Sequence, residues 1–431
     1  MFLNKFKKID NFSIVVFLLS FFSGLLLFLI LFNNYGQSAM VLPGDANYYF
    51  ELSQNLNYFF TQDTLRGPVV ILLFALGNFL FQSNLGAIII QLLLKSTAAV
   101  LVYLLGRRFF SPKVGKIGAL LFALEPYSLY FVSFYMSETI LVFLLLLAVY
   151  SFVLYFDNNK YGWLILTFII LGLLSLTKPI TLFLPLVFVV FFWLKGMRSK
   201  VKLLVGLLVF ILVIFPWLLR NKLLFDTWQI SSVPSHNLLF YNALPVYSEV
   251  NNINTAEARE EIVNQLDLDS NDLVNFDNAA LYRDKGLDII LQHPRSYVVI
   301  HFKGMIKFLT SNGYRHLITD LSDQEISIPN KAEFLSSPGI IFNYLLNPTF
   351  LLLLFSNLFW AVIYLVIIIG SWYFIRRRYR LIWIYFLGIL IFYFVFLTGP
   401  THGDHYKISV MPFLFLLFAL IFDLKLVKQK K

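Results

Sequence analysis

Cysteine and charge are both scarce in this chain. Its 431 residues contain no cysteine, which excludes disulfides, thiolate metal sites and a cysteine nucleophile. Any chemistry must therefore use carboxylates, hydroxyls, histidines or basic side chains. Only 13% of the residues are charged and 59% are hydrophobic, whereas soluble domains have about 25% and about 45–50%. These proportions predict an integral membrane protein.

The net charge of +10 is unevenly distributed. Residues 220–345 hold 10 Lys and Arg against 15 Asp and Glu, a balance of −5, so the rest of the chain carries +15. Basic residues are expected at the cytoplasmic ends of membrane helices. The positive total is therefore not a sign of nucleic-acid binding.

Apolar runs long enough to cross a bilayer recur along the sequence. A membrane-spanning helix needs about 20 such residues, and ten runs qualify. They lie near 13–32, 86–105, 114–133, 139–156, 162–177, 179–194, 203–219, 350–375, 381–397 and 408–423. The expected fold class is an all-α polytopic membrane protein with about ten transmembrane helices.

An eleventh run, GPVVILLFALGNFLF at 67–81, is ambiguous on length. If it does not cross, all basic clusters face the cytoplasm, as the positive-inside rule prefers. These clusters are Lys5/Lys7/Lys8, Arg107/Arg108/Lys113/Lys116, Lys195/Arg198/Lys200/Lys202, Arg376/Arg377/Arg378/Arg380 and Lys425/Lys428/Lys430/Lys431. We therefore expect 67–81 to be a surface-lying or re-entrant helix on the outer face of the plasma membrane, with both termini cytoplasmic.

This topology predicts three parts. Residues 1–219 form an N-terminal transmembrane catalytic module, whose outer loop 33–85 carries juxtamembrane helices. Residues 220–345 are too long and too polar for a simple connection and are expected to be a small extracytoplasmic domain. Residues 346–431 supply the C-terminal transmembrane helices.

Two carboxylates fall at the outer membrane boundary. Asp45 follows a Pro-Gly turn, and Glu138 begins a spanning helix in YMSETIL. Both residues are also suited to capping a helix N-terminus. Their common location beside cations favours a catalytic role, because partial desolvation and nearby charges usually tune the pKa of a general base.

The outer boundary also carries cations. Arg66 precedes the 67–81 helix and Lys178 lies between two spans. Each could simply extend its charged end toward lipid headgroups. The alternative is that they bind a phosphate through charge-assisted contacts.

The last outer turn, THGDHYK, gathers His402, Asp404, His405, Tyr406 and Lys407. Its spacing matches no compact metal-ligand motif, so no metal site is predicted, although a divalent cation stays the alternative. We interpret this turn as a rim that contacts an anionic substrate.

Two charges fall near the middle of the bilayer, Lys95 and Glu125. Unpaired charges there are costly. The sequence therefore predicts that Lys95 and Glu125 form a structural pair.

In order and spacing, these segments resemble the dolichyl-phosphate-mannose protein mannosyltransferases and aminoarabinose transferases, which are membrane glycosyltransferases of the GT-C fold. PGDANYYFELSQNL resembles the first outer loop, with Asp45 at the place of the catalytic aspartate. LRGPVVILLFALGNFLF resembles the juxtamembrane helix whose basic residue, here Arg66, contacts the lipid-linked phosphate. The segment containing YMSETILVF puts Glu138 at the place of the second acid.

Two later segments extend the resemblance over nearly the whole chain. LLGLLSLTKPITLFLPL is similar to the Thr-Arg-Pro turn, with Lys178 in place of the usual arginine. GDHYKISVMPFLFLL is similar to the closing basic-Tyr-basic segment, with His405, Tyr406 and Lys407 in those places.

The resemblance implies a GT-C-like glycosyltransferase of the cell envelope that moves a hexosyl or pentosyl group, with inversion, from a polyprenyl-phosphate donor to an acceptor. The acceptor is a glycan, lipid or protein outside the cytoplasm. Asp45 would be the general base, and Glu138 would orient the acceptor or tune Asp45. Arg66, Lys178 and Lys407 would stabilise the departing phosphate. The rival interpretation, a transporter or flippase of lipid-linked sugars, predicts polar residues along several spans.

Overall fold

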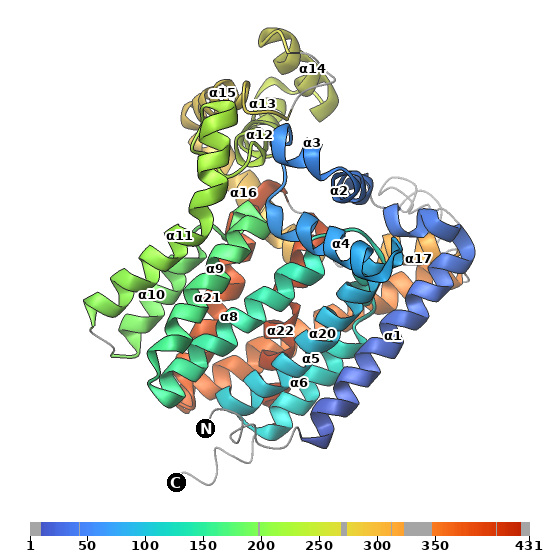
Figure 1. Cartoon of the computed structure of the whole chain (residues 1–431), viewed down its shortest axis with the longest axis vertical. Helices are drawn as coiled ribbons and strands as arrows, with labels where there is room; N and C mark the ends of the chain where they lie inside the picture. Colours follow the sequence, from blue (N-terminus) through green and yellow to red (C-terminus); the bar gives the residue numbers. More distant parts are fainter. Residues whose placement is uncertain are drawn as a thin grey trace.

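The computed structural model describes residues 10–42, 44–196, 199–268, 274–311, 313–322, 347–401 and 403–423, and helices dominate this part of the chain (Figure 1). The N-terminal half contains α1 (Asn11–Tyr35), η2 (Gly36–Val41), α2 (Gly44–Gln54), α3 (Leu56–Thr61), α4 (Pro68–Phe81), α5 (Leu85–Phe109), α6 (Pro112–Leu124), α7 (Pro126–Tyr130), η3 (Phe131–Ser133), α8 (Glu138–Asn158), α9 (Tyr161–Thr177), η4 (Pro179–Thr181), α10 (Leu184–Leu194) and α11 (Lys200–Phe225). The C-terminal half contains α12 (Val233–Asn237), η5 (Leu238–Ala243), α13 (Leu244–Asn251), α14 (Thr255–Gln265), α15 (Ala279–Gln292), α16 (Pro294–Thr310), α17 (Tyr314–Ser322), α20 (Pro348–Arg376), α21 (Leu381–Thr398), η6 (Gly399–Thr401), η7 (Asp404–Ser409), α22 (Met411–Ala419) and η8 (Leu420–Asp423).

Within the described residues, six helices are long and apolar enough to cross a membrane: α1, α5, α8, α11, α20 and α21. Three of the other predicted spans correspond to shorter apolar segments: Tyr161–Thr177, Pro179–Leu194 and Met411–Asp423. The predicted fold class, an all-α polytopic membrane protein, is confirmed.

The predicted span 114–133 was wrong as a single helix. The chain leaves helical geometry at Glu125, whose φ and ψ are −66° and 113°, and α7 starts at Pro126. A residue before proline is driven out of the helical region by the pyrrolidine ring, so the helix ends there. The Glu125 carboxylate then caps α7, accepting hydrogen bonds from Tyr127 N at 3.2 Å and Ser128 N at 2.6 Å.

This break also changes the predicted pairing of Lys95 with Glu125. Both side chains are buried, but no ion pair within 4 Å joins them among the residues that the structure describes. Lys95 Nζ instead donates to Phe122 O at 2.8 Å and to Ser128 Oγ at 2.7 Å. Phe122 lies in the last turn of α6, where carbonyls lack intrahelical partners and the helix dipole is negative. The two charges therefore stabilise the two helix ends at the break, and Ser128 connects them.

Helix α4 has the arrangement that a helix which does not cross the bundle should have. A Cβ on Gly67, just before α4, would lie 1.9 Å from Leu176 O near the end of α9. Just beyond α4, Asn84 accepts hydrogen bonds from Gln54 Nε2 at 3.1 Å and from the Tyr135 hydroxyl at 2.7 Å. Both ends of α4 therefore lie at the end of the bundle that carries α2.

Connections that contain basic residues lie at the opposite end of the bundle, which is drawn at the bottom of Figure 1. Arg108 at the end of α5 is 3.2 Å from Asp157 at the end of α8. Lys195 at the end of α10 lies 4.1 Å from the ring centroid of Trp383, near the start of α21. The connections α5–α6, α8–α9, α10–α11 and α20–α21 consequently share one end.

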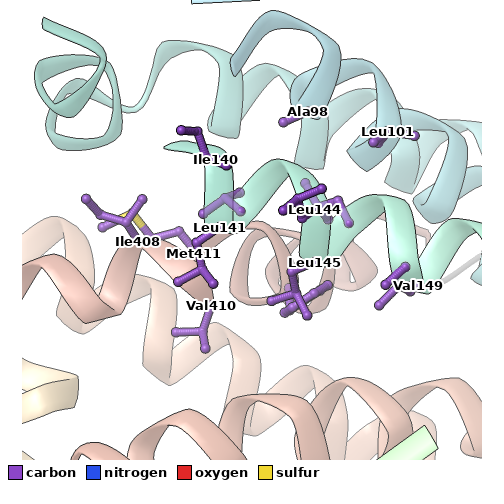
Figure 2. Packing of buried hydrophobic residues seen from close by; sticks show 14 of the residues in the cluster. Ala98, Leu101, Ile140, Leu141, Leu144, Leu145, Val149, Ile408, Val410 and Met411 are labelled. Carbon is purple, nitrogen blue, oxygen red and sulfur yellow. The ribbon is translucent and has the colours of Figure 1, made fainter. Parts of the chain in front are cut away.

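The centre of the bundle is α8, most of which is buried. Figure 2 shows its residues Ile140, Leu141, Leu144, Leu145 and Val149 packed between α5 and the segment Ile408–Met411 that leads into α22. This packing fixes Glu138, the first residue of α8, relative to the turn that precedes α22.

Helices α12–α15 lie beyond the bundle at the top of Figure 1 and have their own apolar cluster, which includes Leu239, Phe240, Ile262 and Tyr282. Helix α16 joins the two parts, because Tyr297 and Ile300 pack against this cluster and Phe308 joins the core of the bundle, and α17 packs on the bundle through Leu317. The predicted outer segment 220–345 is thus divided in its packing, and its last part, 323–345, lies outside the described residues.

Candidate active site

A carboxylate and a guanidinium from the first outer loop form the exposed part of the candidate site. Asp45 lies in the first turn of α2, and Arg66 in the connection that leads to α4. Asp45 Oδ1 is 3.0 Å from an Arg66 nitrogen, with 57% of the Asp45 side chain exposed and 16% of that of Arg66. Asp45 is thus a residue inside the helix, ion-paired and open to solvent on one side.

Arg66 is held by the residues around it. Its backbone N donates to Asp63 Oδ2 at 2.9 Å, and Asp63 also accepts a hydrogen bond from the Tyr48 hydroxyl. The guanidinium lies 4.7 Å from the centroid of the Tyr49 ring. Burial raises the pKa of Asp63 above its usual value, while its hydrogen bonds oppose that rise. The aromatic face and the backbone anchor fix the direction of the Arg66 side chain.

Glu138 and Lys178 form a second ion pair, and this one is buried. Lys178 Nζ donates to Glu138 Oε1 at 2.7 Å, with 13% of the Lys178 side chain and 1% of that of Glu138 exposed. Burial acts to lower the pKa of Lys178, but the Glu138 carboxylate outweighs it and raises that pKa above its ordinary value. Lys178 Nζ also lies 4.2 Å from the centroid of the Tyr406 ring.

His405 lies near both carboxylates, Glu138 and Asp45. Its Nε2 is 3.9 Å from Glu138 Oε1, and its ring centroid is 4.4 Å from that of Tyr406. Burial and the nearby Lys178 ammonium lower the pKa of His405 to about 4, while Glu138 and Asp45 oppose that shift. A neutral imidazole therefore faces the site at neutral pH.

A cavity of about 720 Å³ opens between Asp45 and the outer helices α16 and α17. We call it the acidic cavity. It is lined by Leu42, Gly44, Asp45, Tyr127, Tyr130, Phe131, Met136, Lys307, Ser311, His316, Asp320, Thr401, Gly403, Asp404 and His405. Asp45 and His405 face this space, whereas Glu138 lies behind His405 with 1% of its side chain exposed.

The structure keeps several predicted site residues away from the acidic cavity. Lys407 is fully buried, and its Nζ donates to Leu309 O at 2.8 Å and Ser311 O at 2.9 Å. It therefore fixes the C-terminal end of α16 to the bundle rather than facing the cavity. Lys95 and Glu125 lie at the α6–α7 break. His402 is outside the described residues.

Other residues at the site were missed from the sequence. The α17 residues His316 and Asp320 line the cavity, and Asp320 accepts a hydrogen bond from the Tyr130 hydroxyl. No local motif marks them, since their position depends on how α17 packs against α7. Tyr49 also follows the apolar spacing of α2, so the sequence gives no sign of its place beside Arg66.

Among the described residues, no group of three or more His, Asp or Glu side chains is arranged to hold a metal ion. Asp404, one of the residues weighed as a ligand, accepts a hydrogen bond from the Ser311 hydroxyl.

Residues 65–219 match the model of a family described as dolichyl-phosphate-mannose-protein mannosyltransferase. Over these residues the match agrees with the family resemblance that the sequence motifs indicated, and it supports a glycosyltransferase. It includes Arg66, Glu138 and Lys178. No curated protein matches the chain in sequence.

The fold is similar to that of an oligosaccharyltransferase from Archaeoglobus fulgidus. The apo crystal structure of that enzyme shares 15% identity at a TM-score of 0.53, over 95% of this chain and 50% of that one. A second structure shows the oligosaccharyltransferase AglB from the same organism with an inhibitory peptide and a dolichol-phosphate. It shares 14% identity at a TM-score of 0.51, over 97% of this chain and 51% of that one. The chain therefore has a GT-C-like fold and spans about half the length of these proteins.

Proposed function

We propose that this protein is an inverting glycosyltransferase that moves a sugar from a polyprenyl-phosphate donor to an acceptor hydroxyl outside the cytoplasm. The observation that carries the proposal is the meeting of Asp45 and Arg66 from the first outer loop with Lys178 and His405 from two distant segments, at the end of the bundle opposite the basic clusters. The partial family match and the dolichol-phosphate bound in the AglB neighbour support a lipid-linked donor.

In this mechanism Asp45 accepts the proton of the acceptor hydroxyl. The acceptor oxygen then bonds to the anomeric carbon from the face opposite the phosphate, and the bond from that carbon to the phosphate oxygen breaks. Polyprenyl phosphate leaves with the electron pair of that bond. The configuration at the sugar carbon is inverted because there is a single displacement.

Arg66 and Lys178 stabilise the charge on the departing phosphate. Arg66 brings a fixed guanidinium, and its Nε has no hydrogen-bond acceptor among the described residues. A bound phosphate would compete with Asp45 for this guanidinium, and the carboxylate released from Arg66 would be free to accept a proton. Donor binding would thereby activate the base.

Glu138 has a positioning role in this mechanism rather than direct contact with the acceptor. It holds Lys178 Nζ at 2.7 Å and faces His405 at 3.9 Å from within the protein. Lys407 is left out of the phosphate site because its ammonium is used by two backbone carbonyls.

The basic end of the bundle would face the cytoplasm by the positive-inside rule. The acidic cavity then opens on the outer face of the plasma membrane, where a glycan, lipid or protein acceptor would enter. Residues 1–219 would supply Asp45, Arg66, Glu138 and Lys178, and the later outer helices would form the acceptor side. The sugar transferred would be a hexose or pentose.

The test is to incubate the purified protein with a panel of radiolabelled polyprenyl-phosphate sugars and membrane-extract acceptors, and to follow the release of polyprenyl phosphate. We expect Asp45→Asn to lower turnover by at least about 10²-fold, as general-base catalysis typically supplies about 10²–10⁴. Glu51→Gln is the matched control, because Glu51 is an exposed carboxylate on the same helix α2. Turnover of Asp45→Asn within about tenfold of wild type would rule out the general-base role.

A further inference from the structure

A second cavity, of about 570 Å³, lies between the end of α1, η2, the end of α2, and α4. We call it the amide groove. Its lining consists of Phe32, Gln37, Met40, Ser53, Gln54, Ala75, Asn78, Phe79, Gln82, Ser83, Asn84 and Leu85. The groove and the acidic cavity lie at opposite ends of α2, since Asp45 in its first turn lines the acidic cavity and Gln54, its last residue, lines the groove. The volume is in the range of small-molecule sites.

The chemistry of the amide groove differs from that of the acidic cavity. None of the residues that line the groove is charged, whereas five carboxamides and two hydroxyls are among them. The acidic cavity, in contrast, is lined by three carboxylates, a lysine and two histidines. Carboxamides both donate and accept hydrogen bonds. They therefore match a ligand that is rich in hydroxyl groups and carries no charge.

The polar wall of the groove is partly fixed in place. Asn78 Oδ1 accepts hydrogen bonds from Ala87 N at 3.2 Å and from the Tyr135 hydroxyl at 3.0 Å. Asn84 Oδ1 accepts one from Gln54 Nε2 at 3.1 Å. Gln37 is exposed, and its carboxamide makes no side-chain hydrogen bond to the described residues. The groove thus combines an ordered wall with an amide that is available to a ligand.

The rim of the groove continues into the lipid-facing surface. Phe79 lines the groove and is 70% exposed, and its neighbours on α4, Leu76 and Leu80, are exposed as well. Exposed apolar side chains at this density on an apolar helix suit hydrocarbon rather than water. A ligand in the groove can therefore place its headgroup on the carboxamides while an acyl chain lies along α4.

We propose that the amide groove binds the uncharged sugar headgroup of a membrane glycolipid. This site is separate from the transfer reaction, because none of Asp45, Arg66, Lys178 and His405 lines it. It adds to the proposed function a second carbohydrate-binding site at the same membrane face.

The test uses the full-length protein in phosphatidylcholine nanodiscs that contain diglucosyl diacylglycerol and phosphatidylglycerol in equal amounts. Native mass spectrometry counts the lipids that stay bound. The variant is Gln37→Leu combined with Gln82→Leu, two exposed positions in the groove. Gln62→Leu is the matched control, because Gln62 is an exposed glutamine after α3 that does not line the groove.

We expect wild type and Gln62→Leu to retain the glycolipid in preference to phosphatidylglycerol, and the double variant to retain it about tenfold less, the size expected for two lost hydrogen bonds. Equal retention of phosphatidylglycerol, or full retention of the glycolipid by the double variant, would overturn the proposal. Displacement of the glycolipid by millimolar soluble maltose would overturn the assignment to a lipid, because the acyl chain would then contribute nothing.

Discussion

Removing the charge of Glu138 should both destabilise the protein and stop turnover, and the two effects can be separated. Glu138 Oε1 and Lys178 Nζ are 2.7 Å apart and almost wholly buried. At an effective dielectric constant of about 20, the attraction at that distance is about 6 kcal/mol. Part of it is offset by desolvation, so losing one partner of a buried pair typically costs about 3–5 kcal/mol.

Glu138→Gln leaves the Lys178 ammonium buried without its carboxylate, so we expect a large fall in melting temperature. Lys178→Met combined with Glu138→Gln removes both charges, and most of the stability should return. Turnover should not return, because the double variant lacks the Lys178 ammonium that is proposed to stabilise the phosphate. The comparison needs the melting temperatures and the polyprenyl phosphate release of both single variants and the double variant.

The pH of these measurements follows from the pKa of Lys178. Because its pKa is raised in the folded state, the stability that Lys178 gains from the ion pair is complete below the unfolded value of about 10.4 and is lost as the pH rises from that value through the folded pKa. Measurements at pH 7 therefore report the intact pair. A melting temperature of Glu138→Gln equal to that of wild type would refute the proposed ion-pair energetics. So would a double variant whose fall in melting temperature equals the sum of the falls of the two single variants.

Three further predictions concern Lys407, His405 and the orientation in the membrane. Lys407→Met should lower the melting temperature and leave the KM for the donor within about threefold of wild type, since Lys407 donates to two backbone carbonyls. A rise in that KM without a fall in melting temperature would contradict this prediction. The pKa of His405 falls to about 4 in the fold, so the stability that the neutral imidazole contributes is complete above about pH 6.5 and declines as the pH falls toward 4. Over that pH range, the melting temperature of His405→Gln should fall less than that of wild type. An equal fall in both proteins would contradict this prediction. In the cysteine-free chain, a membrane-impermeant thiol reagent should label Glu51→Cys in intact cells and spare Lys113→Cys, and the reverse pattern would invert the topology.

Features that depend on local chemistry or on overall charge could be predicted from the sequence. The distribution of lysine and arginine indicated that 67–81 stays on one side, and the contacts at both ends of α4 agree. The Glu-Pro dipeptide at 125–126 also carried a local signal, because the residue before proline leaves helical geometry. Hydrophobicity alone does not indicate the end of the helix at Glu125, since the apolar run continues on both sides of it.

Features that depend on distant packing could not be predicted. Lys407 and His405 are two residues apart in one turn, yet His405 faces the acidic cavity and Lys407 faces the carbonyls of Leu309 and Ser311. Those carbonyls come from the end of α16 and the residue that follows it, almost a hundred residues earlier in the chain. A basic-Tyr-basic motif shows that two basic side chains are present but not which way each one points.

Exposure separates the roles of the two candidate acids. Asp45 and Glu138 each have one cation within hydrogen-bond distance, at 3.0 Å and 2.7 Å, but 57% of the Asp45 side chain is exposed against 1% of that of Glu138. A general base must reach the hydroxyl proton that it accepts, and Asp45 alone of the two faces the acidic cavity. A carboxylate without access can act only through the groups it holds. We therefore infer that Glu138 acts by keeping Lys178 charged and in position.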